Sequence, residues 1–184
     1  MAYWNSRGLR GNTLEELINI TNDNYLKKNL AIIQKIPTLI KPVEFDKTKG
    51  IIKLAYFEQK SSVDYMGNVQ GIPICFDAKE TTKKSLPISN IHAHQIDFME
   101  NFTKQNGIAF IIAYFQSIDE YYFIPFEDLK VFWDRAQKGG RKSISFQECN
   151  PEFKIQNNKG VFIHYLDILN RYLVLREERE EKLI

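Results

Sequence analysis

The most constraining feature of this sequence is an uninterrupted apolar run near its middle, GIAFIIAYF at residues 107–115. A strand that faces water on one side alternates apolar and polar residues, whereas a continuous run is typical of a strand buried on both faces. The following segment, residues 121–125, is expected to pair with it as a hairpin across Asp119 and Glu120. Because the run is too short to cross a bilayer and no signal peptide is visible, we expect a cytoplasmic protein that binds no membrane.

A second strand is predicted at residues 72–79, where apolar residues alternate. Successive side chains of a strand point to opposite faces. Asp77 and Lys79 therefore share one face at the end of the strand, roughly 7 Å apart for positions separated by two. The predicted apolar face comprises Ile72, Ile74, Phe76 and Ala78, and the other face comprises Cys75, Asp77 and Lys79.

The acid and the lysine at the end of this strand suit the hydrolysis of a phosphodiester bond. Mg²⁺ prefers oxygen ligands and needs only one or two carboxylates besides the substrate phosphate. Asp77 and the preceding Asp64 are the candidate carboxylates, and Lys79 would stabilise developing negative charge. The alternative is that the D-x-K segment is simply a solvated strand end, because such short motifs are common.

Composition indicates a folded globule and sets one condition on its partner. With 184 residues, 43% hydrophobic and 13% aromatic, the chain fits a single domain with a substantial core. Its net charge is only +2, so a polyanion must be bound by basic side chains that gather locally. Cys75 and Cys149 have no metal-binding spacing, and reduced thiols are expected.

Three basic segments are candidates for binding nucleic acid. Residues 1–11 form an arm with Arg10, which either contacts phosphate or is loose. Lys47, Lys49 and Lys53 are either solvated or form a basic projection that suits bent or branched nucleic acid. Arg141 and Lys142 follow two glycines, and lie either against phosphates or in an exposed loop. The β-rich residues 51–59 are expected to pair antiparallel with the strand at 72–79.

Four helices are expected, and one of them carries a polar residue on its apolar face. The first begins at the Thr13 capping box and ends near Asn29, and the second begins at Ser89. The third spans residues 126–137, and the fourth spans residues 162–180. Gln95 lies on the apolar face of the second helix, and is either satisfied by a core carbonyl or turned toward a polar site. His92 and His94 should point to different sides of a helix, so no zinc site is expected.

Several motifs follow one another in an order that is specific. They are Arg10-Gly11 with Thr13-Leu14-Glu15, Thr21-Asn22 with Tyr25, Lys35 with Pro37-Thr38, Ala55-Tyr56-Phe57, Ser62-Val63-Asp64-Tyr65 with Gly67, Phe76-Asp77-Ala78-Lys79-Glu80-Thr81, Asn90 with His92-Ala93-His94-Gln95, and Gly139-Gly140-Arg141-Lys142-Ser143-Ile144. Over nearly its whole length the chain resembles the RecU-type Holliday junction resolvases.

The resemblance implies an α/β fold of the restriction-endonuclease-like, PD-(D/E)XK type, with a mixed β-sheet flanked by helices. It implies one nuclease domain over residues 1–184, with a protruding stalk at about residues 44–56. It also implies a homodimer that cuts four-way DNA junctions with Mg²⁺, or Mn²⁺ as a substitute, and a recombinase is a candidate partner. The implied metal ligands are Ser62, Asp64, Asp77 and Gln95, with Lys79 as the charge stabiliser.

The chain departs from the family pattern at four positions. Ser62 replaces a threonine, Asp77 a glutamate, Leu9 an asparagine and Leu39 a proline. The hydroxyl and the charge are kept, but the shorter arm of Asp77 is expected to affect metal position or preference. Two alternatives therefore stay open: a related PD-(D/E)XK nuclease that acts on duplex or flapped DNA, and a DNA-binding dimer that does not cleave.

Overall fold

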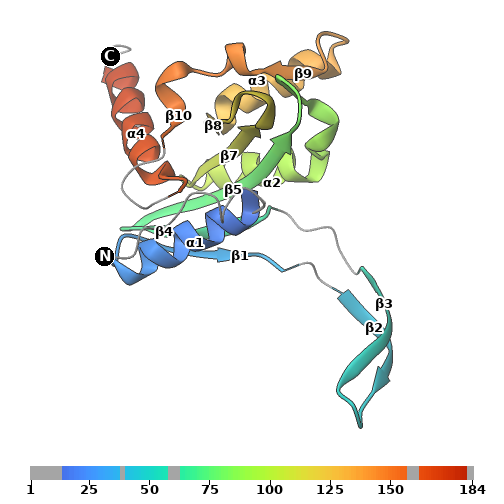
Figure 1. Cartoon of the computed structure of the whole chain (residues 1–184). Helices are drawn as coiled ribbons and strands as arrows, with labels where there is room; N and C mark the ends of the chain where they lie inside the picture. The colour runs from blue at the N-terminus through green and yellow to red at the C-terminus, as the bar shows by residue number, and fades with distance from the viewer. Residues whose placement is uncertain (1–13, 38–39, 58–62, 157–161, 182–184) are drawn as a thin grey trace.

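The computed structural model describes residues 14–37, 40–57, 63–156 and 162–181, and is built around a six-stranded mixed sheet (Figure 1). β5 and β7 are parallel, and every other neighbouring pair in this sheet is antiparallel. In sheet order, the strands are β1 (Ile32–Lys35), β4 (Tyr65–Val69), β5 (Ile72–Thr81), β7 (Ile108–Phe115), β8 (Glu120–Pro125) and β10 (Lys154–Ile155).

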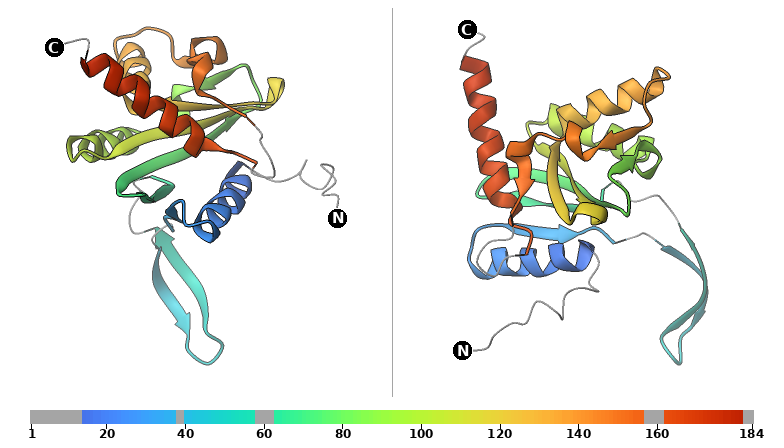
Figure 2. Two further views of the ribbon diagram at one scale, coloured as in Figure 1. Left: turned by 90° about the vertical axis from the view of Figure 1, so that its left-hand side faces the viewer. Right: turned by 45° about the horizontal axis from the view of Figure 1, so that its top comes forward.

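Helices cover both faces of this sheet (Figure 2). α1 (Leu14–Lys27) and α4 (Tyr165–Glu181) pack on one face, and α2 (Ala93–Lys104) and α3 (Phe126–Gln137) pack on the other. Each face has its own apolar core, and β7 contributes Phe110 and Ile112 to one core and Ile111 and Ala113 to the other. The prediction of a strand buried on both faces is therefore confirmed, as is its hairpin with β8.

The partner of β5 differs from the one predicted. β5 pairs with β4 through a two-residue turn in which Gln70 has φ 49° and Gly71 has φ 97°, as a tight hairpin between twisted strands requires. β3 (Ile51–Phe57) pairs instead with β2 (Ile40–Asp46), so the predicted pairing of residues 51–59 with β5 is wrong. Alternation of side chains defines the faces of a strand but not its neighbour, which is why the sequence pattern misled here.

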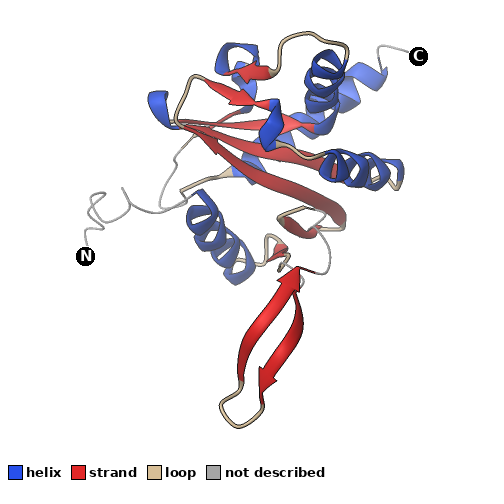
Figure 3. Ribbon diagram, turned by 90° about the vertical axis from the view of Figure 1, so that its right-hand side faces the viewer, coloured by secondary structure: helices blue, strands red, loops and turns tan. Residues whose placement is uncertain are grey.

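β2 and β3 form a two-stranded stalk that projects from the body (Figure 3). The stalk predicted at about residues 44–56 is present, although its strands begin earlier, at Ile40. At its tip, Oδ1 of Asp46 accepts hydrogen bonds from the backbone N–H groups of Thr48 and Lys49, which closes the loop. In the described part of the chain, the principal contacts of β2 and β3 are with each other.

The segment before α2 also differs from the prediction. The helix begins at Ala93 and not at Ser89, which lies in a separate 3-10 helix, η2 (Ile88–Asn90). His92 precedes α2 in extended backbone, so its ring stacks on that of His94 with centroids 5.4 Å apart. The two rings do not point to different sides, because only one of them belongs to the helix.

The remaining elements are short strands and 3-10 helices between the main strands and helices. β6 (Ser85–Pro87) follows β5 and pairs with β9 (Ser143–Ser145), which follows α3. Three further 3-10 helices are η3 (Gln116–Ile118), η4 (Phe146–Glu148) and η5 (Pro151–Phe153). Across the residues that the structure describes, no helix combines the length and the apolar character needed to span a membrane.

Candidate metal centre at the root of the stalk

Asp77 and Lys79 lie on the face of β5 that α2 and α3 cover, together with Cys75. The side chain of Asp77 is 0% exposed and that of Lys79 is 14% exposed. A buried carboxylate is uncommon and must be compensated by a partner. The alternative of a solvated strand end is therefore wrong for this pair.

Asp64 joins them because it lies just after the stalk and directly before β4, the neighbour of β5. Its backbone N–H donates to Oδ1 of Asp77 at 2.7 Å. In return, the backbone N–H of Ala78 donates to Oδ2 of Asp64 at 3.0 Å. These reciprocal hydrogen bonds hold the two carboxylates beside each other and orient both of them.

One carboxylate oxygen is left without a full complement of partners. Oδ2 of Asp77 is buried and makes no hydrogen bond to any described residue, although Nζ of Lys79 lies 3.2 Å away. The pKa of Asp77 is raised to about 6, chiefly because burial disfavours the charged form; Lys79 lowers the pKa by less than burial raises it, and the charge of Asp64 also raises it. A divalent cation would supply the missing positive charge, so the residues present fit a metal ion.

The other implied ligands are placed less directly. Gln95 is buried in the first turn of α2, where its Oε1 accepts a hydrogen bond from the backbone N–H of His92 at 3.0 Å. The sequence offered a core carbonyl or a polar site as its partner, and the structure shows a local backbone amide. Ser62 lies outside the described residues. Within those residues, no three His, Cys, Asp or Glu side chains cluster as a metal site by themselves.

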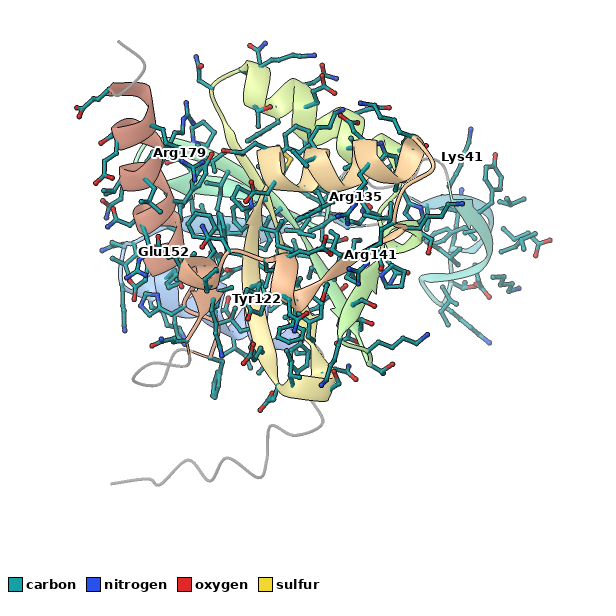
Figure 4. All side chains as sticks on the ribbon, turned by 90° about the horizontal axis from the view of Figure 1, so that it is seen from above. Lys41, Tyr122, Arg135, Arg141, Glu152 and Arg179 are labelled. Atoms are coloured by element: carbon teal, nitrogen blue, oxygen red, sulfur yellow. The ribbon has the colours of Figure 1, made fainter. Side chains whose placement is uncertain are left out.

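The basic candidates form two separate groups. Lys47 and Lys49 lie in the loop at the tip of the stalk, and Lys53 lies on β3, 3.6 Å from Asp46. Arg141 and Lys142 are exposed beyond the end of α3, and Figure 4 labels Arg141. The last candidate, Arg10, lies outside the described residues.

Two exposed lysines were not among the candidates from the sequence. Lys83 and Lys84 lie between β5 and β6, after Thr82. Their position just beyond the D-x-K segment is the sequence feature that could have made them candidates for contacting DNA. They lie next to β6, and the backbone carbonyl of Lys84 accepts a hydrogen bond from Phe146 N–H.

A mixed sheet covered by helices on both faces, with two carboxylates and a lysine gathered at the start of β4 and near the end of β5, is the arrangement expected of the restriction-endonuclease-like, PD-(D/E)XK class of nucleases. Residues 9–171 match the family model described as "RecU: Recombination protein U". The chain therefore belongs to the RecU family.

Relatives in this family carry a common description. A protein of Listeria welshimeri, "Holliday junction resolvase RecU", is 46% identical over 145 residues, which is 77% of this chain and 72% of the relative. A Bacillus mycoides protein with the same description is 44% identical over 76% of this chain and 72% of its own. Among solved structures, the Holliday junction resolvase Hjc of Archaeoglobus fulgidus aligns with a TM-score of 0.36 and 10% identity, over 61% of this chain and 74% of its own.

Proposed function

We propose that this protein is a metal-dependent endonuclease that resolves Holliday junctions in DNA recombination and repair, by cutting one phosphodiester bond in each of two equivalent strands. The observation that carries the proposal is the reciprocal pair of hydrogen bonds that holds Asp64 against Asp77, beside the ammonium of Lys79. Membership of the RecU family, whose relatives are named Holliday junction resolvases, supports the choice of substrate.

The metal ion would be held by Asp64 and Asp77, with Ser62 and Gln95 as the further ligands that the family resemblance implies. An amide oxygen has two lone pairs, so Oε1 of Gln95 can keep its hydrogen bond to His92 and still face a cation. We propose Mg²⁺ as the ion, with Mn²⁺ able to replace it, because both accept oxygen ligands. When bound, such an ion lowers the pKa of a coordinated water and polarises the phosphoryl group.

Lys79 is the charge stabiliser in this proposal. Its ammonium is largely buried and held near Asp77, so it is fixed close to the place where negative charge would develop on the phosphate. A fixed charge in a site shielded from water stabilises a transition state more than the same charge in water would.

Replacing this lysine should slow cleavage without emptying the metal site. We expect Lys79→Gln to lower the rate of junction cleavage about 10²-fold, the usual effect of removing one stabilising group. Affinity for Mn²⁺ should be kept or increased, because a positive charge near the cation has gone. Single-turnover cleavage and Mn²⁺ titration measure the two quantities. A variant that cleaves at the wild-type rate would remove Lys79 from the proposed chemistry.

The stalk supports the proposal of a homodimer. Most of its large apolar side chains are exposed, which is unusual for a two-stranded ribbon in water. A second copy would cover them, and a twofold dimer would place two identical sites on the two equivalent strands of a junction. The exposed residues are Ile40, Val43, Phe45, Ile51, Ile52, Leu54 and Tyr56.

The dimer can be tested at one cross-strand pair on the stalk. Phe45 is paired with Ile52 and is 53% exposed, while Ile52 is 39% exposed. The double change of Phe45→Ser and Ile52→Ser should weaken dimerisation at least tenfold, because it removes apolar area from the proposed interface. Sedimentation velocity gives the dissociation constant. The matched control is Val174→Ser, an exposed apolar residue on α4, which should leave the constant unchanged.

DNA would be recognised through branched shape and backbone charge, with Lys47, Lys49, Lys53, Arg141, Lys142 and Arg10 as the proposed contacts. Affinity should consequently fall steeply as salt is raised. We place the enzyme in the cytoplasm, and a recombinase remains a proposed partner. The two thiols, Cys75 and Cys149, are buried and unpaired, which agrees with a reducing compartment.

The decisive experiment compares a mobile four-way junction with a linear duplex of the same arms, with Mg²⁺ and with EDTA. We expect symmetric nicks in the junction alone, and none in EDTA. Equal cleavage of the duplex would favour a related nuclease with another substrate. Tight junction binding without cleavage in either Mg²⁺ or Mn²⁺ would favour a DNA-binding dimer in which Asp77 is a disabling substitution.

A further inference from the structure

A groove lies between η2 and the end of α3, and among the described residues Lys142 is the one predicted site residue that lines it. It has a volume of about 490 Å³, within the range of sites that hold small ligands. One wall is aromatic and aliphatic, and the other is backbone and basic, while no Asp or Glu lines it. The lining residues are Ile88, Ser89, Ile91, Trp133, Ala136, Gln137, Gly139 and Lys142.

The walls of this groove are held in place by hydrogen bonds. The backbone N–H of Ile88 donates to the carbonyl of Lys142 at 3.0 Å, which joins η2 to the loop after α3. Nη2 of Arg135 donates to the carbonyl of Ser143 at 2.9 Å, which anchors the same loop to α3. The groove is therefore formed before any ligand binds, and a ligand pays little to order it.

The groove lies on the same side of the sheet as the metal centre. α3 packs over β7 and β8, on the face of the sheet that carries Asp77. β6 continues from the end of β5 and leads directly into η2, and two residues further on α2 begins, with Gln95 in its first turn. The groove and the metal centre therefore lie on the same side of the sheet and are joined by short segments of the chain.

Its electrostatic character matches a nucleic acid. Lys142 lines the groove, and Lys138 and Arg141 are exposed beside it in the same loop. Lys138 and Lys142 form no salt bridge with a described residue, whereas Arg141 lies 3.3 Å from Glu148. Free ammonium groups next to a half-buried indole form the combination that binds a phosphate and stacks a base.

We infer that this groove receives an unstacked nucleotide from the branch point of the junction, with its base on Trp133 and its phosphate near Lys142. The inference rests on the proposed function and deepens it, because it explains how a branched substrate is distinguished from a duplex. In a linear duplex every base is stacked and paired, so no nucleotide is free to enter. At the centre of an open junction each flanking base pair lacks a stacking neighbour on one side, so the cost of extruding a base is smaller.

The first test uses Trp133 itself as the probe. The chain has two tryptophans, and Trp4 lies outside the described residues, so a Trp4→Phe background leaves one indole. In EDTA, where no cleavage occurs, a four-way junction should quench the emission of Trp133, and a linear duplex should not. Emission that is unchanged by a saturating junction, or changed equally by the duplex, overturns the inference.

The second test separates stacking from packing. Trp133→Leu keeps an apolar side chain without an aromatic face, and should lower junction affinity about 5- to 100-fold, as the loss of one base–aromatic stack does. Trp133→Phe should keep most of the affinity, and duplex affinity should stay unchanged in both. The control is Val131→Ala, 65% exposed on the same helix. Equal loss for junction and duplex, or no loss, overturns the inference.

Two further measurements allow the inference to be tested if a Trp133 variant does not fold, and separately from the proposed nuclease activity. Lys142→Gln should reduce the salt dependence of junction binding by about one phosphate contact, even if Trp133→Leu does not fold. Cleavage of the junction by the wild-type protein in Mg²⁺ is scored separately. A wild type that cleaves normally while Trp133 gives no response leaves the nuclease intact and removes only the groove.

Discussion

Asp77→Asn should abolish junction cleavage, by about 10³-fold or more, while making the metal-free protein more stable. The activity is lost because the amide supplies no negative charge to a cation at the centre of the site. The fold is kept because the amide oxygen can still accept the hydrogen bond from Asp64 N–H. Cleavage of a synthetic four-way junction in Mg²⁺ measures the first effect.

The stability effect follows from the buried charge. Burial raises the pKa of Asp77 from 3.8 to about 6, so in the folded state ionisation is penalised and the protonated form is favoured. The contribution of this group is therefore fully present below pH 3.8, and stability is lost as the pH rises through about 6. Each unit of pKa shift corresponds to about 1.4 kcal/mol, so at pH 8 the variant should gain roughly 3 kcal/mol.

Thermal unfolding in EDTA at pH 8 and pH 5 measures this gain, which should be smaller at pH 5. Asp97→Asn, on the exposed side of α2, is the matched control and should change neither activity nor stability. An Asp77→Asn protein that cleaves junctions at the wild-type rate would contradict the proposed metal centre. A gain in stability from Asp77→Asn that is the same at pH 5 and at pH 8 would contradict the penalty for the buried charge.

Removing the stalk should separate metal binding from junction resolution. Ile40 is paired with Phe57, so residues 41–56 can be replaced by the two-residue turn Asn-Gly without opening the body. The shortened protein should lose at least about 100-fold in junction cleavage, because the tip lysines and the proposed apolar interface are both gone. Its affinity for Mn²⁺ should be unchanged.

The body is expected to fold without the stalk, because β2 and β3 make their principal contacts with each other. A melting temperature within about 5 °C of the wild type would show this. Lys47→Ala with Lys49→Ala in the intact stalk is the companion variant, which should weaken DNA binding and leave the dimer in place. A stalkless protein that resolves junctions normally would remove the stalk from the mechanism.

Much of the sheet and its helices could be predicted. β7 was recognised by its continuous apolar run, and its hairpin with β8 and the span of α3 were as expected. Where the prediction failed, neighbouring segments of the chain were misread. The pairing of residues 51–59 with β5 was wrong because the true partner, β2, is identified only by the hairpin they form. The start of α2 was misplaced because η2 mimics a first helical turn.

The candidate site was also predicted only in part. The period of β5 was enough to put Asp77 and Lys79 on one face, because the direction of a side chain in a strand depends only on its parity. That Asp64 lies against Asp77, and that Gln95 is bound to the backbone of His92, depended on β4 and α2 reaching their places.

The sequence by itself therefore determined which side chains share a face and which segments are buried, because both follow from the local order of residues. Only the tertiary structure decided that Asp77 is enclosed, that its second oxygen lacks a hydrogen bond, and that a groove beside Trp133 opens on the same side. Desolvation and enclosure are produced by segments far apart in the chain, so no local pattern contains them.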